Sequence, residues 1–207
     1  MIRVSMSEPK IWRTFISSVT ALIEEAAFTF TPDGIQMKAM DPSKISLVDF
    51  ELPAEAFDEY RVKEKTVVGV KLSDLEQALS RMRPKDTLTL EADTEKNRIN
   101  LIFKGASTRK IGIPILSLEE EQLPEPKLNF TAKVAVLAQV LKDGLKDAEM
   151  ISDNVKLVAS KEEFCMTAES DKGSAELKLS KGDEGLVDIK VDEPATATYS
   201  LRYLEDM

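Results

Sequence analysis

Lysine and arginine side chains recur on the outward faces of the helices that this sequence predicts. The set is spread over four predicted helices and the residues next to them: Lys10, Arg13, Arg81, Arg83, Lys142, Lys146 and Arg202. Cationic side chains on an exposed helix face bind phosphate oxygens and do not read base sequence. If the helices share one side of a sheet, these residues predict a surface for a nucleic-acid backbone. An ordinary solvated helix face is the alternative.

Carboxylates offer a different chemistry, namely metal-dependent hydrolysis. Asp33, Asp41 and Asp49 are the best available ligand set, although they form no recognised metal-binding motif. The sequence has no histidine, which removes the commonest general base and the commonest zinc ligand. It also has neither a glycine-rich phosphate loop nor a nucleophile-elbow motif. A carboxylate-metal hydrolase is therefore the alternative function.

The composition is that of an acidic globular protein. The chain has 207 residues, of which 43% are hydrophobic and 31% charged, and its formal net charge is −9. This length allows one large or two small domains, and the negative charge confines any DNA-facing surface to a local patch. The single cysteine, Cys165, excludes an internal disulfide and fits a reducing compartment. No apolar run reaches the length of a membrane span, and the N-terminus is too polar for a signal peptide.

Periodicity predicts a strand, a helix and three strands, and then the same order again. Apolar residues at helical spacing between Ile11 and Ile23 predict the first helix. A Thr-Pro-Asp-Gly turn at residues 31–34 predicts a hairpin between the next two strands. The second helix is predicted over residues 73–82, with Ser73 and Glu76 as a capping box.

A longer repeat, with a period of about 129 residues, overlies this order. The shift places Trp12 on Leu141 and Met37 on Met166, so that apolar positions coincide. We therefore predict an α+β fold of two similar domains, residues 1–116 and 129–207, each built on a doubled strand-helix-strands unit. Residues 117–128 are rich in glutamate and proline and form the connecting loop. By the template of the first domain the second is incomplete, so we expect a truncated form of a longer protein.

Two predicted strands are candidate sheet edges, at residues 109–116 and 174–180. An open edge invites pairing with a strand of another molecule. Head-to-tail pairing of one strand with the other closes a ring of subunits if the rotation permits. The alternative is that both strands are interior or protected.

A turn fringed by apolar side chains is a candidate docking site. Met40, Ile45 and Leu47 surround it, and linker residues complete a shallow groove if the linker folds back: Leu123, Pro124 and Leu128. Such a groove fits a partner's short helix or aromatic anchors. The alternative is a loop that folds back on its own core.

Three stretches, "TPDGIQMKAMD", "MDPSKISLVDFEL" and "YSLRYLEDM", resemble the proliferating cell nuclear antigen (PCNA) family of DNA sliding clamps in its archaeal form. The resemblance covers essentially the whole chain, in order. It implies the DNA clamp fold, a homotrimeric ring around duplex DNA, and a polymerase processivity factor that is neither an enzyme nor dependent on a cofactor. Members of the family continue past the position of Met207, and the resemblance implies that this continuation forms one side of the docking groove. A subunit of a heterotrimeric checkpoint clamp is a related alternative.

The resemblance also implies roles for particular residues. The seven cationic residues face DNA, and the turn and linker residues hold the short hydrophobic-aromatic PIP-box motif of client proteins. The subunit interface comprises Arg109, Lys110, Ile111, Ile113, Ser174, Ala175, Glu176, Leu177 and Lys178. Implied partners are a clamp loader, DNA polymerase, flap endonuclease and ligase, with no membrane. The implied location is the cytoplasmic nucleoid if the source is archaeal and the nucleus if it is eukaryotic.

Overall fold

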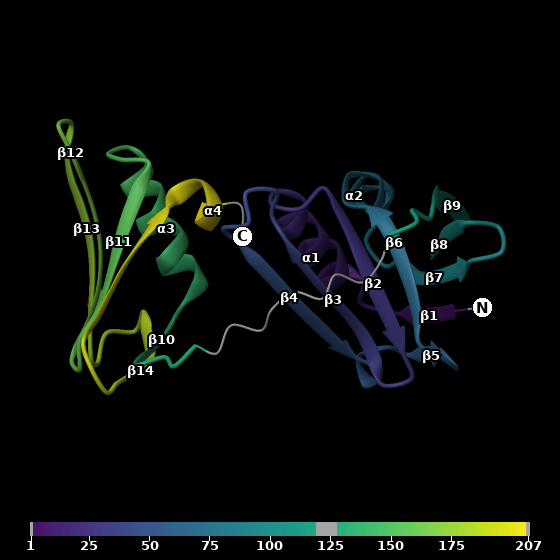
Figure 1. The fold of residues 1–207 in the computed structure, drawn as a ribbon, viewed down its shortest axis with the longest axis horizontal. Coiled ribbons are helices and arrows are strands. Elements are labelled where there is room, and N and C mark those ends of the chain that lie inside the picture. Colours follow the sequence, from purple (N-terminus) through teal and green to yellow (C-terminus); the bar gives the residue numbers. More distant parts are fainter. Residues whose placement is uncertain (1, 119–127, 206–207) are drawn as a thin grey trace. The chain divides into compact units, whose positions relative to one another are not determined.

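Two compact units make up the chain, and each is described by itself. The computed structural model describes residues 2–118 and 128–205, and the first unit passes into the second between residues 124 and 125. Both units combine antiparallel sheets with short helices (Figure 1). This arrangement confirms the predicted α+β class.

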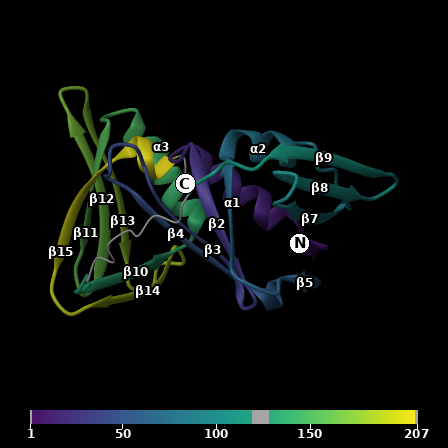
Figure 2. The same cartoon turned by 45° about the vertical axis from the view of Figure 1, so that its right-hand side comes forward.

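The first unit contains two antiparallel sheets and two α-helices. Its elements are β1 (Ile2–Met6), α1 (Lys10–Thr20), β2 (Glu25–Thr31), β3 (Gly34–Met40), β4 (Leu47–Pro53), η1 (Ala54–Ala56), β5 (Glu59–Arg61), β6 (Thr66–Lys71), α2 (Leu72–Ser80), β7 (Thr87–Asp93), β8 (Arg98–Lys104) and β9 (Thr108–Pro114). One sheet has the order β4-β3-β2-β6 and the other β5-β1-β7-β8-β9. Figure 2 shows β7, β8 and β9 side by side at the end of the second sheet.

Both helices and one face of each sheet contribute to a single apolar core in this unit. Trp12, Ile16 and Val19 are buried along α1, as their helical spacing predicts. Strands β7 and β8 alternate buried with more exposed residues, which is the pattern of a sheet with one packed face. The hydroxyl group of Ser17 donates a hydrogen bond to Glu76 at 2.7 Å. This bond links α1 to α2.

The second unit repeats this plan with fewer strands in the described residues. Its elements are β10 (Ala132–Val136), α3 (Ala138–Glu149), β11 (Asn154–Ala159), β12 (Glu163–Ser170), β13 (Gly173–Ser180), β14 (Leu186–Val191), β15 (Ala195–Ser200) and α4 (Leu201–Glu205). One sheet has the order β13-β12-β11-β15, and the other pairs β10 with β14. Leu145, Ala148 and Leu201 on the helices pack with Phe164 and Met166 on β12 to form a second core.

The internal repeat predicted at an offset of about 129 residues is confirmed. Strand β6 begins at Thr66 and β15 at Ala195, and the sheet order β4-β3-β2-β6 corresponds element by element to β13-β12-β11-β15. The pair β5-β1 likewise corresponds to β14-β10. Helices α1 and α3 are therefore equivalent, and so are the strands β4 and β13 beside them.

The start of α2 differs from the prediction. The helix begins at Leu72 after Lys71, without a side-chain capping bond, so the predicted capping box of Ser73 and Glu76 is wrong. Leu72 is fully buried, and the carboxylate of Glu76 accepts a hydrogen bond from Ser17 instead. Packing of α2 against α1 and the core therefore decides where the helix begins.

Candidate DNA-facing and partner-binding surfaces

The cationic residues predicted to face DNA all lie exposed on helices or directly beside them. Lys10 and Arg13 occupy the first turn of α1, and Arg202 is the second residue of α4. Lys142 and Lys146 are one turn apart on α3. Within the residues that the structure describes, no salt bridge holds any of the seven. Their charges are therefore available to an anionic partner.

Strand β9 is an edge of the five-stranded sheet. A groove of about 450 Å³ lies between this strand and α2, and its lining includes Asp74, Gln77, Arg81 and Ile111. Arg81 is thus both one of the predicted DNA-facing residues and part of the groove at this edge. Lys110 is exposed and Ile111 half-buried on the same strand.

Arg109, predicted at the subunit interface, is held within its own unit. Its guanidinium group forms an ion pair with the buried carboxylate of Asp86 and donates a hydrogen bond to the carbonyl oxygen of Arg81 at 2.8 Å. It also lies 5.4 Å from the centroid of the Phe103 ring, within the range of a cation–π interaction. These contacts therefore tie Arg109 on β9 to the rest of its own unit.

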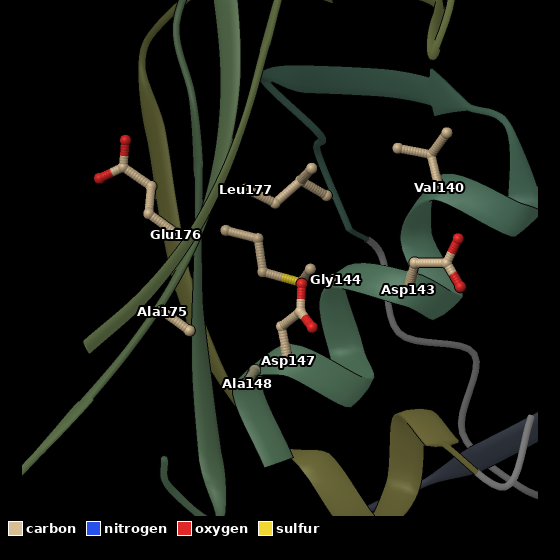
Figure 3. Close-up of a pocket in the computed structure, with 9 residues that line it drawn as sticks. Val140, Asp143, Gly144, Asp147, Ala148, Ala175, Glu176 and Leu177 are labelled. Carbon is tan, nitrogen blue, oxygen red and sulfur yellow. The ribbon is translucent and has the colours of Figure 1, made fainter. Parts of the chain in front are cut away.

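Strand β13 is an edge of the four-stranded sheet in the second unit. Ala175 and Leu177 are half-buried on its helix side, and Ser174, Glu176 and Lys178 are exposed. The ammonium group of Lys178 pairs with Glu163 at 2.6 Å, and this hydrogen bond raises the pKa of Lys178. Between β13 and α3 lies a cavity of about 180 Å³ (Figure 3).

Acidic side chains mark the α3 side of this cavity. Asp143 and Asp147 line it, together with the backbone at Gly144 (Figure 3). These three residues are not among the site candidates that sequence patterns predict. A glycine inside a helix costs roughly 1 kcal/mol relative to alanine. Gly144 in a predicted helix was therefore the sequence feature that could have pointed to this cavity.

The turn between β3 and β4 is organised by Asp41, whose side chain is buried with 3% of its surface exposed. Its carboxylate accepts hydrogen bonds from the amides of Ile45 at 2.7 Å, Ser46 at 2.6 Å and Ser43 at 3.1 Å. The Ser43 hydroxyl also donates to it. These bonds, led by the Ser43 hydroxyl, lower the pKa of Asp41 to about 2.

The apolar residues predicted to bind client proteins lie around this turn. Ile45 is 73% exposed and Leu47 36% exposed, and Met40 on β3 lies directly opposite Leu47 on β4. Leu123 and Pro124 lie outside the described residues. Leu128 is exposed and belongs to the second unit.

The carboxylates considered for a metal site do not form one. The carboxylate oxygens of Asp41 already accept hydrogen bonds from amides of its own loop. Asp49 pairs with Lys38 at 3.1 Å. Across residues 2–118 and 128–205, no three side chains of His, Cys, Asp or Glu cluster closely enough to bind a metal ion. None of the helices in these ranges combines the length and apolar character that crossing a bilayer requires.

Comparison with known families identifies the chain's relatives. The family model "Proliferating cell nuclear antigen, N-terminal domain" matches residues 1–122, and the model of the C-terminal domain matches residues 125–207. The chain belongs to the PCNA family. PCNA-family proteins are non-enzymatic, so the hydrolase alternative is wrong.

Curated PCNA-family relatives and a solved structure agree with this assignment. The chain is 43% identical to the DNA polymerase sliding clamp of Pyrococcus furiosus and 41% identical to DNA polymerase sliding clamp 1 of Thermococcus kodakarensis. Each alignment covers 96% of this chain and 79% of the relative. The crystal structure of PCNA from Thermococcus kodakaraensis matches with a TM-score of 0.95 and 28% identity, covering 100% of this chain and 84% of that one. The clamp fold is thereby confirmed.

Proposed function

We propose that this chain is a subunit of a DNA sliding clamp, a processivity factor that encircles duplex DNA and retains a polymerase on it. The observation that carries the proposal is the placement of exposed lysine and arginine side chains on helices of an acidic protein. A net charge of −9 disfavours general attraction to DNA. Cationic side chains on the helix faces allow the DNA backbone to pass without tight, sequence-specific binding.

Ring formation is the second part of the proposal. Strand β9 of one copy pairs with β13 of the next copy, because both strands are sheet edges with one side unpaired in the described residues. The contact is heterologous, so three copies of a two-domain chain close a ring when the rotation per subunit is one third of a turn. The connecting loop, residues 117–128, joins the two domains within each copy.

Client binding is the third part. Ile45, Leu47 and Met40 offer an apolar surface beside an ordered turn. Leu123 and Pro124, outside the described residues, and Leu128 are further client-binding candidates from the sequence alone. Short hydrophobic-aromatic motifs fit such a surface. The clients that we propose are DNA polymerase, flap endonuclease and ligase, and a clamp loader opens the ring.

Topological retention distinguishes a clamp from an ordinary DNA-binding protein. In the test, a clamp loader places the chain on nicked circular DNA, and gel filtration removes the free protein. The circle is then cut. We expect retention on the circle and rapid loss after linearisation. Equal retention on circular and linear DNA would show binding by contacts alone and would overturn the proposal.

A further inference from the structure

The first unit buries a carboxylate close to its edge strand β9. Asp86 directly precedes β7 and exposes only 5% of its surface. Burial of a carboxylate is costly unless hydrogen bonds and a cationic partner compensate it. The groups that compensate Asp86 therefore show what this residue holds in place.

Asp86 closes the turn that follows α2. The backbone amide of Arg83 donates a hydrogen bond to its carboxylate at 2.8 Å, and the amide of Asp86 donates one to the carbonyl oxygen of Arg83 at 3.1 Å. Between them, Lys85 has a φ of 71°, a conformation that non-glycine residues rarely adopt. The carboxylate therefore compensates a strained turn and fixes the backbone that carries Arg83.

Arg109 connects this turn to both α2 and β9. Its guanidinium group extends from β9, pairs with the carboxylate of Asp86 and donates a hydrogen bond to the carbonyl oxygen of Arg81 at 2.8 Å. Arg81 is the C-cap residue of α2, and the last carbonyl groups of a helix lack intrahelical partners and attract cations. Arg109 therefore caps α2, and Asp86 holds Arg109 in the position from which it does so.

Gly105, in the turn between β8 and β9, makes room for the buried carboxylate. A Cβ atom at this position would collide with Oδ1 of Asp86. The turn can therefore carry a side chain here only if Asp86 moves. Three separate segments, at residues 81–86, 105 and 109, thus converge on one buried group.

The segments that Asp86 holds border the groove between α2 and β9. Arg81 and Ile111 line this groove together with Asp74 from the first turn of α2, and Arg83 is exposed two residues beyond Arg81. A surface whose backbone is already fixed loses less conformational freedom on binding than one that must first be ordered. The contacts of Asp86 therefore preorganise this edge of the first unit.

We propose that Asp86 is a positioning residue for self-association of this chain. It is buried, and it acts through Arg109 and the turn at residues 83–86. These contacts hold α2 and β9 together, so that the groove with Arg81 and Ile111 keeps a fixed shape for a second copy. The inference rests on the proposed ring and adds a residue on which its assembly depends.

Sedimentation equilibrium of the full chain without DNA tests this role. Each copy carries a net charge of −9, so the loss of one negative charge should by itself reduce repulsion and favour self-association. The positioning role predicts the opposite for Asp86→Asn, namely roughly tenfold weaker self-association than in the wild type. Glu55→Gln removes the same charge from an exposed position in η1 and should not weaken self-association.

Gly105→Ala is a second variant, which changes no charge. The added methyl group displaces the carboxylate of Asp86, so self-association should weaken as in Asp86→Asn. Tyr60→Phe is the control for stability, because it removes a hydrogen bond to Thr31 in the same unit without a change of charge. It should assemble as the wild type does, and equal weakening by Tyr60→Phe would show that Asp86 acts through stability alone.

Asp86→Asn should also add little to the effect of Arg109→Met, since both substitutions remove the same ion pair. Circular dichroism and thermal unfolding check that each variant is folded at the temperature of measurement, and if Asp86→Asn does not fold, Gly105→Ala decides. Wild-type assembly together with unchanged assembly of the folded variants would overturn the role of Asp86 and leave the ring intact. A wild-type chain that stays monomeric at every concentration would overturn the ring and this role with it.

Discussion

The carboxylate of Asp41 accepts a hydrogen bond from the backbone amide of Ile45 at 2.7 Å. The amide of the next residue, Ser46, donates a second bond to the same carboxylate at 2.6 Å. Lys44, which directly precedes Ile45, has a φ of 58°, a conformation that non-glycine residues rarely adopt. The buried carboxylate therefore compensates a strained turn and fixes the position of the exposed Ile45 side chain.

Asp41→Asn should weaken binding of a hydrophobic-aromatic client peptide several-fold. The amide retains one acceptor oxygen but directs an NH₂ group toward backbone donors, so the turn loses its fixed shape and binding must order it. Isothermal titration calorimetry measures the change. Asp49→Asn is the matched control, because this exposed carboxylate lies on the adjacent strand outside the turn. Equal effects of the two substitutions would show that charge alone matters.

The same turn should be sensitive to acid. The pKa of Asp41 is lowered from 3.8 to about 2, so its hydrogen bonds stabilise the folded state above pH 3.8 and lose this contribution as the pH falls toward 2. Amide chemical shifts of Ser43, Ile45 and Ser46 should therefore titrate together near pH 2. A common midpoint near 4 would contradict the assignment.

Lys142→Gln combined with Lys146→Gln should weaken binding to a short linear duplex and reduce its salt dependence. Each phosphate contact contributes roughly 0.9 to the slope of log K against log salt, so the slope should fall by about one to two. Fluorescence anisotropy at several salt concentrations gives the slope. The control replaces Lys156 and Lys161, which are exposed outside the helices of the same unit, and changes the net charge equally. If both pairs lower the slope alike, α3 is not the DNA-facing surface.

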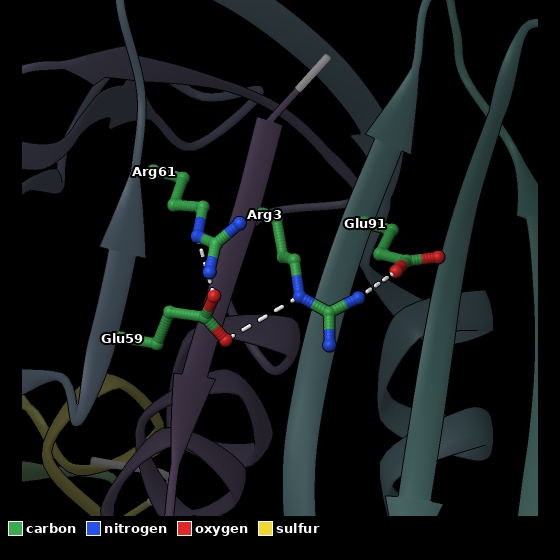
Figure 4. Close-up of polar contacts among 4 residues, drawn as sticks. All are labelled: Arg3, Glu59, Arg61 and Glu91. Carbon is green, nitrogen blue, oxygen red and sulfur yellow. Dashed lines mark hydrogen bonds and ion pairs between the residues drawn. The ribbon is translucent and has the colours of Figure 1, made fainter.

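A cross-strand ion-pair network should stabilise the edge of the five-stranded sheet. Arg3 on β1 pairs with Glu91 on β7 and with Glu59 on β5, and Glu59 also pairs with Arg61 (Figure 4). Such a network outweighs isolated surface pairs because its side chains are already partly ordered. Arg3→Met should lower the free energy of unfolding of the first unit by about 1 kcal/mol, and high salt should reduce the difference.

Urea unfolding followed by fluorescence tests this prediction, since Trp12 is the only tryptophan and reports the first unit. Lys96→Met is the control. Lys96 forms one pair with Asp93 and its side chain is 79% exposed, so the loss should be a few tenths of a kcal/mol at most. A salt-independent effect of Arg3→Met would point to lost packing of its aliphatic stem.

Periodicity predicted the parts of the fold that depend on local pattern. The apolar stripe of α1 and the alternating strands bury the residues that their spacing indicates, and the repeat follows because equivalent cores select equivalent apolar positions. The core does not need Met40, which is half-buried, or Leu47, which is exposed, and the sequence carries a signal of this. Their replacement by Glu169 and Glu176 in the repeat supplied that signal.

Features that depend on contacts between distant residues were not predictable in this way. The resemblance implies Arg109 at the subunit interface, but nothing in the sequence indicates its contacts with Asp86 and the Phe103 ring. The cavity beside Gly144 depends on how closely α3 approaches β12 and β13, which no single segment encodes. The three-residue strand β5 is too short for an alternating pattern and depends on pairing with β1.

Tyr60 should make the first unit less stable in strong alkali. Its hydroxyl group donates a hydrogen bond to the carbonyl oxygen of Thr31 at 2.7 Å, and burial raises its pKa from 10.0 to about 12. Between these values the unfolded chain has released the proton and the folded chain still holds it, so the free energy of unfolding falls as the pH rises. Tyr60→Phe removes this titration. At neutral pH it should cost about 1 kcal/mol for the lost hydrogen bond.

The two unfolding curves should therefore converge between pH 10 and 12. Trp12 fluorescence in urea follows the first unit in both proteins, and all other alkaline titrations are common to them. Tyr199 lies on β15 in the second unit, so Tyr199→Phe serves as the control for loss of a phenol elsewhere and should leave the unfolding of the first unit unchanged. Parallel curves for wild type and Tyr60→Phe would show that the Tyr60 phenol ionises as readily in the folded state as in the unfolded chain.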